Sequence, residues 1–463
     1  MAGPVTPGVG VEEQAPSAVE KVWPSMPARY WALFVIVLAT FMSFLDQVVF
    51  GMLAESIKKD FSLTDTQLGF LAGPATIICY FFVGIPLARL ADIYPRKYVL
   101  AGSSAVVGVL IALSGIAQTF MQFIGTRVFL AAGGSAHAPA SYSLLADAFP
   151  PEKLTRAFAL LQFGFIGGTT LGPVIGGRLV TASTAWPDTP FLGLSIYNWQ
   201  WVLLYLALPS IIAGLLFLLI REPQRLAPRE DGPHVPKDAS LGRKIITFMG
   251  FDAARAIHAG RGVYYPMFGA LALSSVESFG ILFWRVPYLM REFGWTAQQI
   301  GDLIGPVALA ASIAGMIVGG WGVEWLAKRY KDANVRAATL AFTGTTVMII
   351  LALSIPDPFW STLVFGLSPF FAIAGAVPQN AAIQRVAPND MRGQVTAFYL
   401  FMFTFFGAFG SWFIGFVSDY VTKDLGNAIL FTACTILPLA VFLMYRAIRP
   451  YREEVIRLEA MGR

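Results

Sequence analysis

Four ionisable residues stand inside long apolar stretches of the 463-residue sequence: Asp46, Arg127, His137 and Glu277. An ionisable side chain is unfavourable within a membrane and is retained there when it has a partner or a task. A carboxylate and a guanidinium that face one cavity can pair while it is empty and exchange partners when an anion or a proton arrives. We therefore predict that Arg127 binds an anionic ligand and that Asp46 and Glu277 carry protons.

Each of these residues also has a purely structural interpretation. Asp46 and Arg127 can form a permanent ion pair, and Glu277 can accept a hydrogen bond from a neighbouring serine. His137 can line the ligand path inward of Arg127, or it can be a hydrogen-bonded packing residue. Pro139, two residues later, is expected to interrupt its helix.

Large aromatic residues are candidates for the apolar part of the same binding site. A ligand with a charged group and an apolar body would place its body against such rings. Aromatic residues are also ordinary core residues of any helical bundle. The predicted aromatic wall consists of Phe44, Phe283, Trp284, Tyr288 and Phe405.

A short acidic and basic motif occurs twice, 232 residues apart, which predicts two similar halves. In ARLADIYPRK and in GWGVEWLAKR, an acid at the end of an apolar run is followed four and five residues later by two basic residues. Such an acid can pair with the other half in one conformation and lose that partner in another, so we predict a conformational latch. Basic loops on the inner side of a membrane are the alternative. The latch residues are Asp92, Arg96 and Lys97 in the first copy and Glu324, Lys328 and Arg329 in the second.

Glycines spaced four apart mark the apolar stretch at 155–180. This spacing puts a groove along one helix face that lets a neighbouring helix approach closely, and the proline within it weakens the helix so that it can bend. Simple packing is the alternative. The residues predicted to form this face are Gly168, Gly172, Pro173, Gly176 and Gly177.

The composition is that of a membrane protein, because 56% of the residues are apolar and only 13% are charged. The two cysteines, Cys79 and Cys434, lie in apolar runs, so no disulfide framework, metal site or cofactor is expected. The sequence has no phosphate-binding GxxxxGK[ST] loop, which argues against an ATP-driven pump. A single intramembrane histidine with no nearby Asp or Cys partner argues against an enzyme.

Twelve membrane-spanning helices are predicted, each long enough to cross about 30 Å of hydrocarbon. The positions of Lys and Arg place both termini in the cytoplasm. The helices lie near 29–55, 66–91, 97–118, 121–147, 155–180, 199–221, 264–290, 298–326, 334–355, 359–385, 393–419 and 427–448. The predicted organisation is a disordered tail (1–27), a six-helix half (28–221), a linker with a helix on the membrane surface (222–262), a second half (263–450) and a tail (451–463).

Two six-helix halves with this repeated loop resemble the major facilitator superfamily over about residues 28–450. The sequence departs from the family's loop motif at Ala88 and Ile93. The run GTTLGPVIGG also resembles a motif associated with exporters of the antiport type. The fold class that the resemblance implies is an all-α membrane protein with the major facilitator fold.

Within that superfamily the sequence resembles the spinster-like branch, which is associated with sphingolipids and lysophospholipids. The matching segments are FLDQVVFGMLAESIKKDFSLTDTQLGFL, TRVFLAAGGSAHAPASYSLLADAFP and WRVPYLMREFGWTAQQIG. Asp46 and Arg127 match the branch's positions for the proton and the anionic headgroup. Gly134 replaces a Glu of the branch, and Gln47 replaces a basic residue.

The resemblance implies a monomeric secondary active transporter of the plasma membrane that works by alternating access. Its expected partners are a lipid-like or drug-like organic anion, a proton and the lipid bilayer, with no nucleic acid. Uptake of a small carboxylate, and a channel or receptor without transport, are the alternatives.

Overall fold

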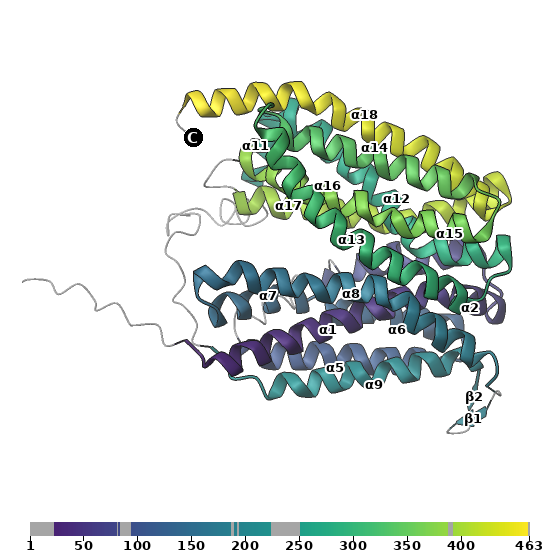
Figure 1. Ribbon diagram of the computed structural model, residues 1–463. Coiled ribbons are helices and arrows are strands. Elements are labelled where there is room, and N and C mark those ends of the chain that lie inside the picture. Colours follow the sequence, from purple (N-terminus) through teal and green to yellow (C-terminus); the bar gives the residue numbers. More distant parts are fainter. Residues whose placement is uncertain are drawn as a thin grey trace, which may run out of the picture.

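The computed structural model arranges the chain in two helical bundles, one from each half of the sequence (Figure 1). It describes residues 23–80, 82–83, 94–186, 189–191, 194–223, 251–387 and 392–461. The acid Asp92 of the first loop motif lies outside these residues, as do the predicted tail up to residue 22 and the linker at 224–250.

As far as its residues are described, the first bundle is helical apart from one short hairpin. Its elements are α1 (Met26–Met52), α2 (Ala54–Asp60), α3 (Asp65–Ala72), α5 (Arg96–Ser114), α6 (Phe120–Gly134), α7 (His137–Ala148), α8 (Pro151–Ser183), β1 (Thr189–Phe191), β2 (Leu194–Ile196) and α9 (Asn198–Leu218). The antiparallel β1–β2 hairpin, with Thr189 opposite Ile196, was not expected from the sequence.

The second bundle is entirely helical in the described residues. Its elements are α11 (Phe251–Ala259), α12 (Arg261–Phe293), α13 (Ala297–Ala327), α14 (Ala333–Ser354), α15 (Pro358–Leu367), α16 (Pro369–Val386), α17 (Arg392–Val417), the π-helical turn η1 (Ser418–Thr422) and α18 (Leu425–Ala460). α11 falls in the second part of the predicted linker, where a short helix was expected.

Ten helices within the described residues are long and apolar enough to cross a membrane. The other two predicted spans explain the difference from twelve. The span at 66–91 begins as α3 and continues partly outside the described residues. The span at 121–147 is divided into α6 and α7 at Ser135 and Ala136. Pro139 has no N–H to donate to the Ser135 carbonyl, and its ring crowds that carbonyl, so the helix breaks four residues before it.

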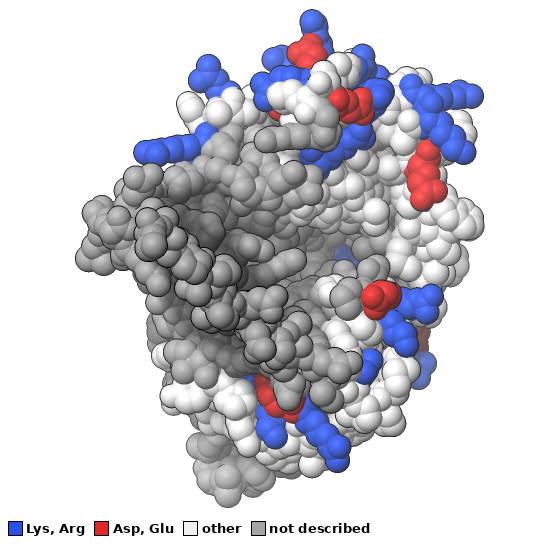
Figure 2. All heavy atoms as spheres, turned by 90° about the vertical axis from the view of Figure 1, so that its left-hand side faces the viewer, with Lys and Arg blue, Asp and Glu red and all other residues white. Residues whose placement is uncertain are grey.

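The two halves meet tightly at one end of the molecule. We call the end that contains Asp65 and Asp419 the closed end, and the opposite end, which contains Met26 and Arg96, the open end. At the closed end α3 packs on α17, α8 packs on α13 and α1 packs on α12. The halves draw apart toward the open end in Figure 1, and Figure 2 shows that face hollowed between them.

The apolar cores follow the same division. Leu144 and Phe217 belong to a core made by the first half alone, and Phe268 belongs to one made by the second half alone. A third core contains residues of both halves, among them Phe123 and Ile414. Opening the closed end would therefore expose part of this shared core to water, which is unfavourable.

Candidate functional site

Asp46 of α1 and Arg127 of α6 form a buried ion pair. The guanidinium Nη1 donates to a carboxylate oxygen of Asp46 at 2.9 Å, and both side chains are almost fully buried. Asp46 lies twenty residues, or about 30 Å, along α1 from Met26, and Arg127 lies seven residues from the start of α6. The pair is therefore closer to the closed end than to the open end.

The ion pair leaves much of its hydrogen-bonding capacity unused. Arg127 Nε and Nη2 and one oxygen of Asp46 are buried without a partner among the described residues. The guanidinium also lies over the rings of Phe50, at 4.6 Å, and Phe123, at 5.4 Å. The rings shield the cation from water and favour its position. A carboxylate or phosphate could bind the two unused donors without displacing Asp46.

The pair is separated from the second half by one aromatic ring. Phe50 contacts Phe283 of α12, with ring centroids 5.5 Å apart. Next to it, Gly51 lies against the backbone of Phe283, because a Cβ at Gly51 would be 3.2 Å from the Phe283 carbonyl oxygen. Phe50 also contacts the Arg127 guanidinium. A change in the contact between α1 and α12 would therefore shift a ring that packs on Arg127.

Glu277 is buried in the second half, between α12 and α18. Its carboxylate lies beside Thr432 of α18, and neither oxygen has a hydrogen-bond partner that meets ordinary geometry. The neighbouring hydroxyls of Ser275 and Ser278 donate to backbone carbonyls instead, so the expected serine partner is not found. No described contact joins Glu277 to the Asp46–Arg127 pair.

His137 lies inside the first half, away from Arg127. It borders a small cavity of about 20 Å³ between α1, α5 and α9, together with Ser43, Ser103 and Ser210. Its ring packs against Phe217, and neither ring nitrogen has a hydrogen-bond partner within the described ranges. The structure therefore does not bring His137 to the anion-binding candidate.

The predicted aromatic wall is divided among several contacts. Phe44 packs on Phe165 of α8, and Phe405 packs within α17 on Phe401 and Phe409. Of these five residues, Phe283 has a described contact with Phe50 beside Arg127.

The two other members of the wall, Trp284 and Tyr288, contact residues of the second half. Trp284 donates its indole N–H to the Ser411 carbonyl at 2.7 Å. Tyr288 packs on Phe365 of α15. The five residues thus do not line one surface.

The glycine face of α8 contacts two different helices. Gly168, Gly172 and Gly176 lie against α1, where added Cβ atoms would meet Phe44, Val48 and Val49. Gly177 and Pro173 lie instead against α13 of the second half. One face therefore joins α8 to α1, and the adjacent face forms part of the closed end.

The closed end also contains a cluster of charges that the sequence interpretation missed. Asp65 is buried and accepts two hydrogen bonds from Arg291 of α12, at 2.7 and 2.8 Å, and one from Lys58 at 2.6 Å. Burial raises the pKa of Asp65, but the hydrogen bonds and charges of Arg291 and Lys58 outweigh this effect and lower it to about 2. Asp65 is therefore ionised and ties the first half to the second.

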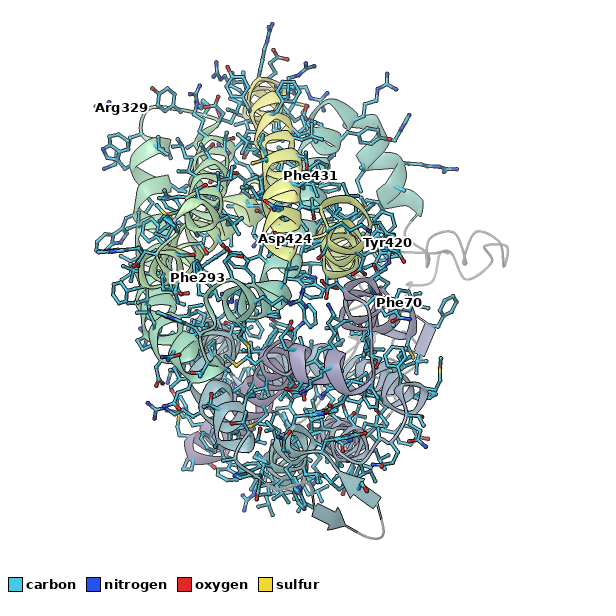
Figure 3. All side chains as sticks on the ribbon, turned by 90° about the vertical axis from the view of Figure 1, so that its right-hand side faces the viewer. Phe70, Phe293, Arg329, Tyr420, Asp424 and Phe431 are labelled. Carbon is cyan, nitrogen blue, oxygen red and sulfur yellow. The ribbon has the colours of Figure 1, made fainter. Side chains whose placement is uncertain are left out.

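Asp419 of η1 completes this connection from the second half. Its carboxylate accepts from the backbone N–H groups of Asp65 and Thr66 and from the Thr66 hydroxyl. These N–H groups open α3 and have no partner within the helix, so the carboxylate caps the helix across the two halves. Figure 3 shows the labelled Tyr420 of η1 next to Phe70 of α3 at this end.

A repeated sequence signal could have identified the closed end. TDTQLG at 64–69 and TAQQIG at 296–301 are again 232 residues apart, and both form capping boxes at the starts of α3 and α13. A Cβ at Gly69 would overlap the Ser411 carbonyl, and one at Gly301 would overlap the Pro173 carbonyl. The same motif therefore makes equivalent close contacts on the two sides of the interface.

At the open end, Arg96 is the centre of a buried network within the first half. It donates to Asp147 of α7 at 2.5 Å and to Glu222 after α9 at 3.0 Å. The backbone N–H of Lys97 also donates to Glu222. The sequence interpretation named Arg96 and Lys97 but not Asp147, near the end of α7, or Glu222, which follows α9.

The second copy of the loop motif behaves differently. Glu324 is exposed and makes no described ion pair, and Arg329 lies over the ring of Trp325. Lys328 is likewise exposed, and Figure 3 shows Arg329 at the outer edge of the second half. The described structure thus gives Glu324 no partner with which to form the predicted latch.

The buried acid of this region is Asp332, which precedes α14. It accepts from Arg336 at 2.7 Å and from Arg452 of α18 at 2.8 Å. Burial raises the pKa of Asp332, but the two arginines hold it below its ordinary value. Asp332 therefore links the start of α14 to α18 at the open end of the second half.

Among the described residues, no three His, Cys, Asp or Glu side chains gather as a metal site would require.

Known proteins resemble the chain over nearly its full length. An "MFS-type efflux pump" from Mycolicibacterium smegmatis is 27% identical over 442 residues, covering 93% of this chain and 95% of the relative. "Protein spinster homolog 1" from Xenopus laevis is 22% identical over 403 residues, covering 82% and 71%.

A solved structure shows the same fold. It is described as a bacterial homolog of the human lysosomal transporter Spinster, inward-facing and unoccupied. Its TM-score is 0.71 at 21% identity, covering 93% of this chain and 98% of that one. The sequence pattern described as Major Facilitator Superfamily matches residues 36–411. The chain therefore belongs to the Major Facilitator Superfamily and is a membrane transporter rather than an enzyme.

Proposed function

We propose that the protein moves an amphipathic organic anion, lipid-like or drug-like, by alternating access coupled to protons. The geometry of the Asp46–Arg127 pair is the main support for this proposal. Arg127 is buried yet keeps two N–H donor groups without a partner in the described part of the chain, and Phe50 and Phe123 provide an apolar surface around its charge. A permanent structural pair would be expected to use these donors, because buried polar groups are nearly always satisfied.

Proton coupling follows from the competition for Arg127. An arriving anion takes over part of the positive charge that stabilises the ionised form of Asp46. Asp46 then binds a proton more readily, and release of that proton restores the ion pair. Glu277 is the second candidate carrier, because its carboxylate is buried and no described residue gives it a charged partner.

The positions of the basic residues suggest which end of the molecule faces the cytoplasm. Figure 2 shows many basic side chains on the open end, and basic residues favour the cytoplasmic side. The open end would then face the cytoplasm, with both termini, and the molecule would be inward-facing in the plasma membrane. In this state the closed end blocks the outer side.

Uptake of a small carboxylate is the alternative within the same mechanism. The two unused donors of Arg127 would bind any carboxylate. The amphipathic anion would need the apolar surface around Arg127, whereas a small carboxylate would not. A channel or a receptor without transport is a further alternative, and a channel would pass solute at far higher rates than a carrier.

Flux into proteoliposomes tests the proposal. With a pH gradient imposed, we expect saturable uptake or extrusion of a lysophospholipid or an apolar organic anion, and weaker transport of a short dicarboxylate. Dissipating the gradient should abolish accumulation. Equal, non-saturable flux of all solutes, or flux independent of the gradient, would contradict a proton-coupled carrier.

A further inference from the structure

A second concentration of positive charge lies at the open end of the second half, outside the candidate site. A cavity of about 1120 Å³ is bounded by the start of α12, the start of α14 and the last part of α18. Figure 2 shows basic side chains gathered over this part of the molecule. Five arginines line the cavity: Arg261, Arg336, Arg446, Arg449 and Arg452.

These arginines are only partly neutralised by the protein. Arg336 and Arg452 share the single carboxylate of Asp332, and Arg449 pairs with Glu453. Arg261 and Arg446 make no ion pair among the described residues. Five guanidinium groups therefore face two carboxylates, which leaves the cavity suited to an anion.

The rest of the lining is aromatic and apolar. Tyr265 of α12 and Phe442 and Tyr445 of α18 are each more than half exposed, and Leu443 lies beside them. Arg446 itself stands over the Phe442 ring at 5.8 Å. Aromatic residues next to basic ones are typical of the boundary between hydrocarbon and headgroups.

The length of α18 places the cavity at that boundary. Arg446 follows Leu425 by twenty-one residues, which is about 32 Å of helix and close to the thickness of the hydrocarbon layer. With Leu425 at the outer boundary, Arg446 reaches the inner one. Phe442, one turn earlier, then lies at the level of the acyl chains.

We propose that this cavity binds an anionic phospholipid of the inner leaflet. The headgroup phosphate would accept hydrogen bonds from Arg261 and Arg446, and an acyl chain would run along Phe442 and Leu443. A phosphate is matched to arginine because its oxygens accept paired N–H donors, and basic pockets between helices on this side bind such headgroups. The apolar lining favours a lipid over a free phosphate.

Binding would join α12 to α18 through the shared phosphate. Both helices belong to the second half, so the lipid would stabilise that half whatever the transported substrate is. The site and its test do not depend on which substrate is transported, whereas the choice of the inner leaflet rests on the orientation proposed above.

Thermal unfolding of the purified full chain in a neutral detergent tests the proposal. Phosphatidylglycerol should raise Tm in a saturable way, whereas phosphatidylcholine and inorganic phosphate should have little effect. Arg261→Gln combined with Arg446→Gln should weaken the apparent Kd for phosphatidylglycerol by about thirtyfold, since each arginine contributes about fivefold. Lys153→Gln combined with Arg457→Gln removes the same charge outside the cavity and should bind like the wild type.

A second variant keeps the test decisive if the double variant folds poorly. Gly262 lines the cavity and has nothing within 4 Å of an added Cβ, so Gly262→Trp should fill the space without changing the charge. It too should lose phosphatidylglycerol binding. Unchanged binding in Gly262→Trp or in the double arginine variant would overturn the site. An equal effect of inorganic phosphate would overturn the lipid, and an equal effect of phosphatidylcholine would overturn the role of charge.

Discussion

The functional behaviour of single residues depends on how completely each buried charge is satisfied. Asp332 is fully paired, and Asp65 is held by a lysine and an arginine. Arg127 is paired through one hydrogen bond, and the residues that the structure describes give Glu277 no charged partner. Asp332 and Asp65 are therefore structural anchors. Arg127 can still bind a ligand, and Glu277 can still bind a proton.

The anchoring role of Asp332 predicts a loss of stability. Asp332→Asn would leave two arginines facing each other without a carboxylate, so Tm should fall by several degrees. Breaking such a buried pair commonly destabilises a protein by about 3 kcal/mol or more. Glu324→Gln is the matched control, because exposed Glu324 should change stability by no more than about 0.5 kcal/mol. Equal effects in thermal unfolding would contradict the assignment.

The pairing of Asp65 predicts how the closed end responds to mutation and acid. Its pKa is about 2 here, against an ordinary value of 3.8, so its stabilising effect is complete above about pH 4 and is lost as the pH falls toward 2. Asp65→Asn should therefore favour opening of the closed end even at neutral pH.

Labelling of a buried cysteine measures this opening. Ile414 belongs to the shared core and is almost fully buried. With Cys79 and Cys434 replaced by serine, Ile414→Cys should react several-fold faster with an impermeant maleimide in Asp65→Asn. Asp302→Asn removes the exposed pair with Arg178 and should change the rate much less. Equal rates in Asp65→Asn and the parent would refute the anchor.

Helix positions were largely predictable from the sequence, but helix partners were not. Long apolar runs bounded by polar turns gave the positions of α1, α13 and α14 to within a few residues. The Thr-x-x-Gln pattern at the starts of α3 and α13 is also typical of a capping box. α8 contacts α1 through one face and α13 through the next face. The four-residue spacing of its glycines does not identify these partners, because they depend on tertiary packing. The β1–β2 hairpin lies in a connection with no periodic apolar pattern.

The close contact of α8 and α13 gives a test at this scale. A methyl group at Gly301 would overlap the Pro173 carbonyl, so Gly301→Ala should push the two helices apart and favour the state in which the closed end is open. Labelling of Ile414→Cys should accelerate, and transport should fall. Gly320→Ala in the same helix meets nothing within 4 Å and is the control. If both alanine variants label and transport alike, the close contact does not control the closed end.

The whole molecule reflects the repeat of 232 residues in its sequence. The repeat predicted two similar halves, and the equivalent contacts of Gly69 and Gly301 follow the same offset. The halves differ in their charges, however. At the open end the first half uses Arg96 as a buried cation between two acids, whereas the second uses Asp332 as a buried acid between two arginines. A motif search could find the shared backbone pattern but not this inversion, since Asp332 lies outside the repeated motif.

The candidate site was only partly predictable for a related reason. Asp46 and Arg127 stood out because charges are rare in apolar runs. Sequence alone could not tell that Phe50 and Phe123 enclose the guanidinium, or that His137 lies within the first half. Such relationships depend on helix rotation, which requires the packed structure.

The central claim is that Arg127 holds the anion while Asp46 carries the proton. Substrate binding to purified protein between about pH 5.5 and about pH 8.5 tests it most directly, over a range in which shielded carboxylates exchange protons. Arg127→Ala should abolish binding, whereas Asp46→Asn should bind substrate with no dependence on pH. If the pair is only structural, each single change should instead destabilise the protein, and Asp46→Asn combined with Arg127→Gln should restore stability. A double variant that binds and transports with normal pH dependence would contradict the claim.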